Sequence, residues 1–134
     1  MQNKLEELAR LPLHRHLGIE NIRSDNGEGA LEFDAGEALI NATGVLHGGV
    51  IYMVLDICAY AGMFSVLPPD RVAVTHDIHV SVMRPVMMGD RVRVTSKTLK
   101  MGRTLCFLEA FAHVNDRIVA KGTVTKSLIE KKLA

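Results

Sequence analysis

The longest apolar stretch in the chain covers residues 50–67, where 15 of 18 side chains are apolar and Asp56 carries the only charge. Pro68 and Pro69 end the stretch, because proline cannot continue a helix. A helix that is apolar on every side is either a membrane span or a buried core helix. A carboxylate near its middle would be costly inside a bilayer. The pattern therefore predicts a buried helix and no membrane segment.

Alternation of apolar and polar positions predicts strands on both sides of this helix. Two short strands precede it, at residues 17–24 and 29–36, joined by a turn at Asp25-Asn26-Gly27. Four strand-like runs follow it, at residues 71–84, 91–100, 104–114 and 118–129. The turns between them are short, which indicates antiparallel neighbours.

Two of the later runs have a period-two pattern that assigns residues to faces. In the first run, one face holds Val72, Val74, Ile78, Val80 and Val82, and the other holds Thr75, Asp77, His79 and Ser81. In the last run, the apolar face holds Ile118, Ala120, Val124 and Leu128.

The start of the chain predicts a short amphipathic helix over residues 3–11, with Leu5, Leu8 and Leu11 on one side and Pro12 at its end. Residues 37–44 read as a loop, with a helical turn at 38–40 as an option. The element order predicts one α+β domain over residues 1–134. A sheet covers one side of the long helix, and the curl of the sheet or a second chain covers the other.

Composition and charge exclude some classes of function. The formal charge of +1 excludes a strongly basic nucleic-acid binder. Residues 1–83 carry 5 basic and 11 acidic side chains, and residues 84–134 carry 11 basic and 4 acidic ones. A basic half can attract an anionic ligand such as a nucleotide phosphate. The alternative is that these charges are the solvated faces of strands. Cys58 and Cys106 lie in apolar runs and are expected to be buried free thiols. Residues 1–11 lack the apolar core of a secretion signal, so we expect a cytoplasmic protein.

The candidate chemistry begins at Gly48 and Gly49, at the head of the long helix. The first helical turn has unpaired N–H groups and the positive end of the helix dipole. Glycine lets a substrate carbonyl approach these groups closely, so the pair suits an oxyanion hole. The alternative is steric, in which the glycines simply admit a neighbouring strand.

Asp56 is the second candidate, because an unpaired carboxylate in so apolar a helix is costly. It is expected to act as a nucleophile or general base that faces a cleft. The alternative is a core aspartate that hydrogen-bonds to the Thr75 hydroxyl or to His47.

The helix length constrains how these groups can work together. At about 1.5 Å per residue, Gly48 and Asp56 are separated by ~12 Å. One carbonyl carbon cannot lie about 3 Å from both. We therefore expect a homodimer with two identical sites at its interface. His47 is expected to orient a backbone group, cap the helix or polarise the substrate.

A metal site is not expected. Strand alternation places His76 and His79 on opposite faces of the first long strand, and His14 and His16 form an equally weak pair.

The segment from Asn41 to Asp56 resembles the signature of hotdog-fold acyl-CoA thioesterases of the phenylacetic-acid-degradation type. That signature is Asn-x-x-Gly-x-x-His-Gly-Gly with an aspartate nine residues after the histidine, and this chain has NATGVLHGG followed by Asp56. The run VTHDIHVSVMRPVMMGD is similar to the third-strand signature of the family. KMGRTL, RIVAKGTVT and HLGIE also resemble family segments, so the similarity covers residues 14–129.

The resemblance implies a curved antiparallel sheet wrapped around the long helix, with dimers that often assemble into tetramers. It implies hydrolysis of an acyl-CoA to free acid and CoA, with no cofactor beyond the substrate. The catalytic residues it implies are Asn41, His47, Gly48, Asp56 and Thr75, with Asp56 and Thr75 supplied by the partner of the Gly48 chain. An aspartate at position 56 distinguishes this type from the 4-hydroxybenzoyl-CoA type, which has glutamate.

Substrate contacts are expected from Gly49, Tyr52 and Tyr60, with Met53 and Met63 also lining the pocket. Arg84 and Arg103 are candidates for contacts with the CoA phosphates. A non-catalytic acyl-CoA sensor on the same fold is the main alternative function. Relatives that act as hydratases or dehydratases pair aspartate with histidine in a motif that is not found here. The acyl group is not determined by the sequence.

Overall fold

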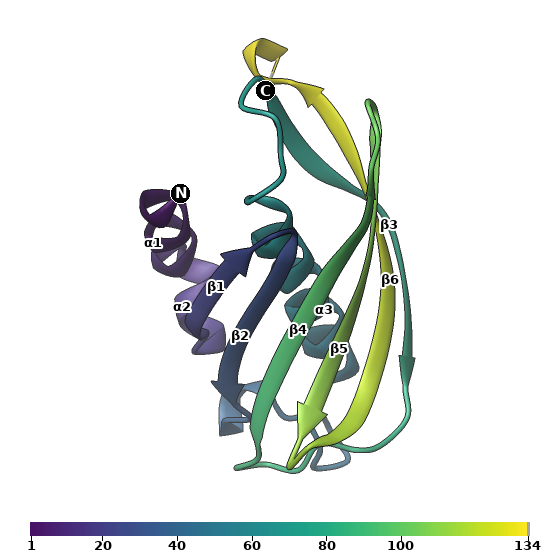
Figure 1. Cartoon of the computed structure of the whole chain (residues 1–134). Helices are drawn as coiled ribbons and strands as arrows, with labels where there is room; N and C mark the ends of the chain where they lie inside the picture. The colour runs from purple at the N-terminus through teal and green to yellow at the C-terminus, as the bar shows by residue number, and fades with distance from the viewer. Residues whose placement is uncertain (134) are drawn as a thin grey trace.

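The computed structural model describes residues 1–133, which form a curved sheet packed around one long helix (Figure 1). The chain starts with two short helices, α1 (Gln2–Arg10) and α2 (Pro12–Leu17), and continues into strands β1 (Glu20–Asp25) and β2 (Glu28–Asp34). A short 3-10 turn, η1 (Glu37–Leu39), leads to the long helix α3 (Gly48–Met63). Four strands follow, β3 (Arg71–Val82), β4 (Arg91–Met101), β5 (Leu105–Val114) and β6 (Arg117–Glu130), and then the 3-10 turn η2 (Lys131–Leu133).

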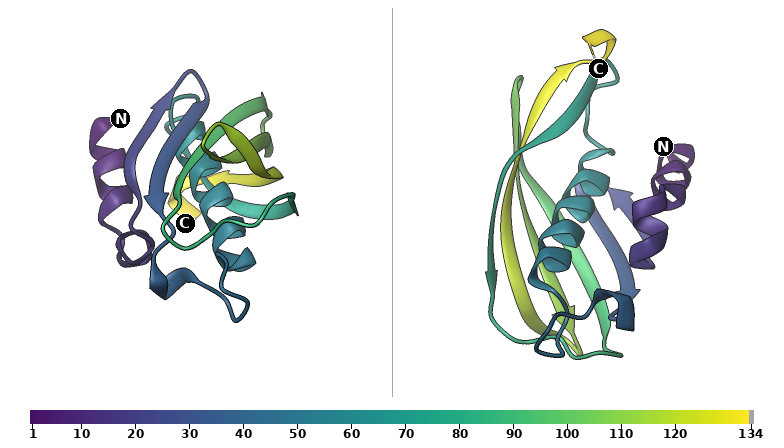
Figure 2. Two further views of the ribbon diagram at one scale, coloured as in Figure 1. Left: turned by 90° about the horizontal axis from the view of Figure 1, so that it is seen from below. Right: turned by 180° about the vertical axis from the view of Figure 1, so that it is seen from behind.

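The six strands form one antiparallel sheet in the order β1-β2-β4-β5-β6-β3. Its concave face wraps α3, and α1 and α2 lie beside β1 at one edge (Figure 2). Because sequential strands mostly pair through short turns, the antiparallel arrangement predicted from the sequence is confirmed. No helix among residues 1–133 is both long and apolar enough to cross a membrane.

Helix α3 is shorter than predicted and is not covered on every side. It ends at Met63 rather than at residue 67, and the chain turns before the two prolines. One stripe of the helix, with a spacing of four residues, remains accessible and consists of Gly48, Tyr52, Asp56 and Tyr60. Gly49 and Met53, beside this stripe, are also accessible. The remaining residues of the helix pack into the core, where Val54, Leu55 and Cys58 are fully buried. Both cysteines are buried free thiols, as predicted.

The helix approaches the sheet closely where Gly62 of α3 faces Gly29 of β2. A Cβ atom at Gly62 would lie 2.6 Å from Ser96 Oγ and 2.7 Å from Gly29 N, distances that no side chain tolerates. The Ser96 hydroxyl donates a hydrogen bond to Cys58 O at 2.8 Å across the same gap. The glycines therefore set how deeply α3 sits in the sheet.

The predicted face assignment of β3 is correct for Ile78 and Val80, which pack against the core, but wrong for the residues before His76, because the strand contains a β-bulge. The register shifts between Thr75 and Asp77, so His76 has no partner residue on β6. A bulge of this kind reverses which alternate side chains face the core. Ala73 and Ile78 therefore both face the core, while Val74 is 51% exposed. Thr75 is directed to α3 together with Ala73, on the face that the simple alternation assigned to valines.

Three smaller expectations also change. A second bulge, in the β5–β6 pair, buries Val119 and leaves Ile118 37% exposed. Pro12 ends α1 as predicted, but it also starts α2, at whose first turn proline is favoured. Leu17 accordingly lies in a helix rather than in the first strand. Met63, expected to line a pocket, is fully buried in the core.

Candidate active site

The N-terminus of α3 presents one unpaired backbone donor. His47 is the N-cap, and its Nδ1 accepts a hydrogen bond from Gly49 N at 2.8 Å. The next two amides, of Val50 and Ile51, donate to His47 O. Among residues 1–133, no acceptor is hydrogen-bonded to the Gly48 N–H. Of the two glycine N–H groups that the sequence offered, only that of Gly48 is therefore open to a ligand.

Asn41 shapes the loop that leads into this helix. Its Oδ1 accepts hydrogen bonds from Thr43 N at 3.0 Å, Thr43 Oγ1 at 2.9 Å and Val45 N at 3.1 Å. Gly44 has a φ of +85°, which glycine adopts without strain. The Asn41 side chain thus holds the turn closed through its oxygen, and its amide nitrogen makes no hydrogen bond within residues 1–133.

Asp56 lies two turns further along the same helix and is held by two groups from the sheet. The Thr75 hydroxyl lies 2.9 Å from each carboxylate oxygen. Lys126 Nζ lies 2.6 Å from Asp56 Oδ1 and 2.9 Å from Thr75 Oγ1. The Lys126 side chain is only 3% exposed, whereas that of Asp56 is 32% exposed. The carboxylate therefore has a buried counter-ion behind it and an open side in front.

Lys126 was missed by the sequence reasoning, although a signal for it was present. Positions 120, 124 and 128 of β6 were assigned to the apolar face, and position 126 has the same parity. A lysine at an inward-facing position is rarely buried without a partner. Searching for its partner would have led to Asp56, the only charged side chain on the helix beneath.

Tyr60 and Tyr52 flank Asp56 on the accessible stripe of α3. Lys126 Nζ lies 5.4 Å from the centre of the Tyr60 ring, which packs edge-on against Phe64 at 4.7 Å. Partial burial raises the pKa of the Tyr60 hydroxyl. Tyr52 is 42% exposed and lies over a groove beside β3. The predicted residues Tyr52, Asp56 and Tyr60 therefore do lie on one surface.

The two arginines proposed for phosphate contacts do not lie together. Arg84 follows β3 and donates a hydrogen bond to Ile118 O, beside the β5–β6 turn. Arg103 lies in the β4–β5 turn, at the opposite end of the sheet (Figure 1). One phosphate group cannot contact both side chains of a single protomer.

The histidines near the site form no metal centre. His76 Nδ1 lies 2.7 Å from Asp77 Oδ2, and His79 Nε2 lies 3.6 Å from Asp77 Oδ1. The expectation that these two rings point to separate faces is therefore wrong, because both reach one carboxylate. Within residues 1–133, no three side chains of the metal-binding types are grouped closely enough to hold an ion.

Comparisons with known proteins identify what this arrangement resembles. The family model described as the thioesterase superfamily matches residues 43–121, which include the α3 N-terminus, Asp56 and Thr75. Human acyl-coenzyme A thioesterase 13 is 29% identical over 114 residues, which cover 82% of this chain and 79% of that protein.

Solved structures match over almost the whole chain. Zebrafish thioesterase superfamily member 2 has a TM-score of 0.82 at 27% identity, covering 95% of this chain and 94% of the other. The Escherichia coli PaaI protein of the phenylacetic acid degradation operon has a TM-score of 0.85 at 20% identity, covering 96% and 91%. These matches confirm the predicted α+β hotdog fold and the resemblance on which it was based.

Proposed function

Because the chain belongs to the thioesterase superfamily, we propose that it hydrolyses acyl-CoA thioesters. In this proposal Asp56 is the reacting carboxylate, and the Gly48 N–H donates a hydrogen bond to the carbonyl oxygen of the thioester. The observation that carries this proposal is the arrangement on one stripe of α3. A partly exposed carboxylate, held by Lys126 and Thr75, lies two turns from an N–H group that has no acceptor within residues 1–133.

Two chemical routes use these groups. In the first, an Asp56 oxygen attacks the thioester carbon, the C–S bond breaks, and CoA leaves as a thiolate that takes a proton. Water then hydrolyses the resulting anhydride. In the second, Asp56 takes a proton from water as the hydroxide adds to the carbonyl carbon, and the same C–S bond breaks. In both routes the carbonyl oxygen becomes negative and is stabilised by the Gly48 N–H and the positive end of the helix dipole.

The two groups are proposed to meet across a homodimer. In a two-fold interface, a contact between residues i and j is repeated between j and i. Antiparallel pairing of two α3 stripes about Tyr52 would therefore bring Gly48 of one protomer beside Asp56 of the partner subunit. An accessible stripe on a mostly buried helix supports this pairing. The edge strand β3 supports it too, because its 12 residues leave one row of backbone groups without a strand partner among residues 1–133.

A clean deletion of the Gly48 N–H is possible in this chain. Proline is favoured at the first position of a helix and lacks the N–H. The preceding residue, His47, has φ −60° and ψ 132°, the extended conformation that a residue before proline prefers. A Cβ at Gly48 would meet no atom within 4 Å. Gly48→Pro should lower kcat by about 10²- to 10³-fold, whereas the control Gly48→Ala, which keeps the N–H, should lose much less.

Mixing two inactive variants tests the whole proposal. Gly48→Pro and Asp56→Asn are each expected to release almost no thiol from acyl-CoA. After subunit exchange at equal amounts, mixed dimers contain one intact composite site, so activity should return to about a quarter of the wild-type value. No recovery, with subunit exchange shown by mass spectrometry, would contradict the shared site. Saturable acyl-CoA binding without thiol release by the wild type would instead favour the sensor.

A further inference from the structure

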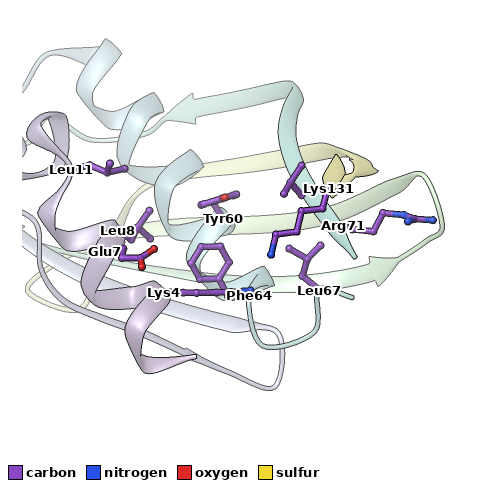
Figure 3. Close-up of a pocket in the computed structure, with 10 residues that line it drawn as sticks. Lys4, Glu7, Leu8, Leu11, Tyr60, Phe64, Leu67, Arg71 and Lys131 are labelled. Atoms are coloured by element: carbon purple, nitrogen blue, oxygen red, sulfur yellow. The ribbon is translucent and has the colours of Figure 1, made fainter. Parts of the chain in front are cut away.

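A cavity of about 290 Å³ lies between α1, the C-terminal end of α3 and the start of β3 (Figure 3). Its walls are mostly apolar and come from both helices and from the segment after α3. Leu8 and Leu11 lie on one side, and Tyr60, Phe64 and Leu67 on the other. A cavity of this kind suits a narrow, largely uncharged chain.

The cavity begins one helical turn from the proposed reaction centre, and Asp56 itself is not part of its lining. Tyr60, which lines it, lies one helical turn beyond Asp56 on the same stripe of α3. Lys126 lies beside both residues, because its Nζ contacts the Asp56 carboxylate and lies over the Tyr60 ring. Phe64 is a further turn away, so the apolar part of the path from Asp56 measures about 12 Å at 1.5 Å per residue.

The far end of this path is cationic. Lys4 and Lys131 reach toward Phe64 from α1 and from the end of the sheet (Figure 3), and Lys4 Nζ lies 5.8 Å from the ring centre. Neither lysine has a carboxylate within ion-pair distance among residues 1–133. Arg71, by contrast, points away from the cavity and pairs with Asp70 at 2.9 Å. Glu7 is the one acidic lining residue.

We infer that this cavity binds an arm of the substrate that carries a negative charge about 12 Å from the thioester carbonyl. The inference rests on the proposed function, since it takes the thioester to lie at Asp56. An extended, uncharged stem would fill the space beside Tyr60 and Phe64, and its anionic end would lie between Lys4 and Lys131. Two arms of a thioester have this form. One is an acyl chain that ends in a carboxylate, and the other is the pantetheine arm that ends in the phosphates of CoA.

Three thioesters separate these sources. Decanoyl-pantetheine has no anion, sebacyl-pantetheine has a carboxylate at the end of its acyl chain, and decanoyl-CoA has phosphates on the other arm. The variant Lys4→Met/Lys131→Met removes both cations and keeps their apolar stems. The matched control is Arg10→Met/Lys132→Met, which removes two exposed cations from the same helix and the same turn but outside the cavity lining.

The double lysine variant should raise KM roughly three- to tenfold for the thioester whose anion enters the cavity, with kcat and KM for decanoyl-pantetheine unchanged. A loss confined to sebacyl-pantetheine identifies the acyl carboxylate, and one confined to decanoyl-CoA identifies the phosphates. The wild-type preference should weaken as salt is raised. Equal KM values for the lysine variant and the control on all three substrates would overturn the inference.

The same proteins distinguish this inference from the function beneath it. Calorimetry measures the affinity for each of the three thioesters, and so tests binding in the cavity without requiring turnover. If the wild type binds but cleaves none of them, the proposed hydrolysis is wrong. A weaker affinity of the lysine variant for one anionic thioester would then still support the cavity assignment.

Discussion

The ion pair between Lys126 and Asp56 makes the sharpest test of how the site is held. We consider Lys126→Met, which keeps the length and apolar stem of the lysine and deletes its charge. Lys126 Nζ lies 2.6 Å from Asp56 Oδ1 and 2.9 Å from Thr75 Oγ1, and the lysine side chain is 3% exposed. The substitution therefore places a thioether where the counter-ion was, and leaves Asp56 with only the Thr75 hydroxyl.

The expected costs are unequal for the two partners. Breaking a fully buried pair costs about 3–5 kcal/mol, because one charge is left without compensation. Asp56 keeps a 32% exposed side chain that water can solvate, so Lys126→Met should cost only about 1–2 kcal/mol of unfolding free energy. Asp56→Asn instead strands an ammonium group that water barely reaches, and should cost about 3 kcal/mol.

The double variant Asp56→Asn/Lys126→Met removes both charges at once. Replacing a whole buried pair with neutral groups is often close to neutral in stability. We therefore expect the double variant to lie within about 1 kcal/mol of the wild type, which requires a coupling energy of several kcal/mol between positions 56 and 126.

Urea unfolding followed by circular dichroism measures all four proteins of this cycle. Single-variant effects that add to within about 0.5 kcal/mol in the double variant would refute the reasoning, because independent sites behave in that way. The stable double variant is also useful as a control in the activity assay. It should fold like the wild type yet release no thiol from acyl-CoA, which separates the chemical role of Asp56 from its role in stability.

Two further predictions concern the close helix–sheet contact and the buried thiols. Gly62→Ala should lower the free energy of unfolding by about 1–3 kcal/mol, because the new Cβ would lie 2.6 Å from Ser96 Oγ. In the same urea titration, the control Gly36→Ala should leave the free energy of unfolding nearly unchanged, because its Cβ would meet no atom within 4 Å. Burial raises the pKa of Cys58 to about 12 and raises that of Cys106. Neither thiol should react with a disulfide reagent at pH 8 until the protein unfolds, and rapid labelling of the native protein would contradict this. The free energy of unfolding should fall as the pH rises above about 9, because only the thiols of the unfolded chain ionise there.

Much of the fold could be predicted because its signals are local. The apolar run before Pro68, with Asp56 as its only charge, indicated a core helix, and turn residues such as Asp25-Asn26-Gly27 marked where strands end. The register could not be predicted, because it depends on pairing between distant strands. Period-two counting assumes an unbroken ladder, and the bulges at His76 and near Val119 break it. An error of one residue moves every later side chain to the other face.

The same bulge explains why the site was only partly predicted. Asp56 stood out because one charge in an apolar helix needs a partner, and the sequence offered Thr75 as one candidate. The strand alternation that places Ile78 in the core would turn Thr75 outward, and only the unpaired His76 allows both to face α3. Once Thr75 points inward, its β6 partner Lys126 must do so too, because residues paired across a ladder share a face. The bulge thus brings hydroxyl, ammonium and carboxylate to one point.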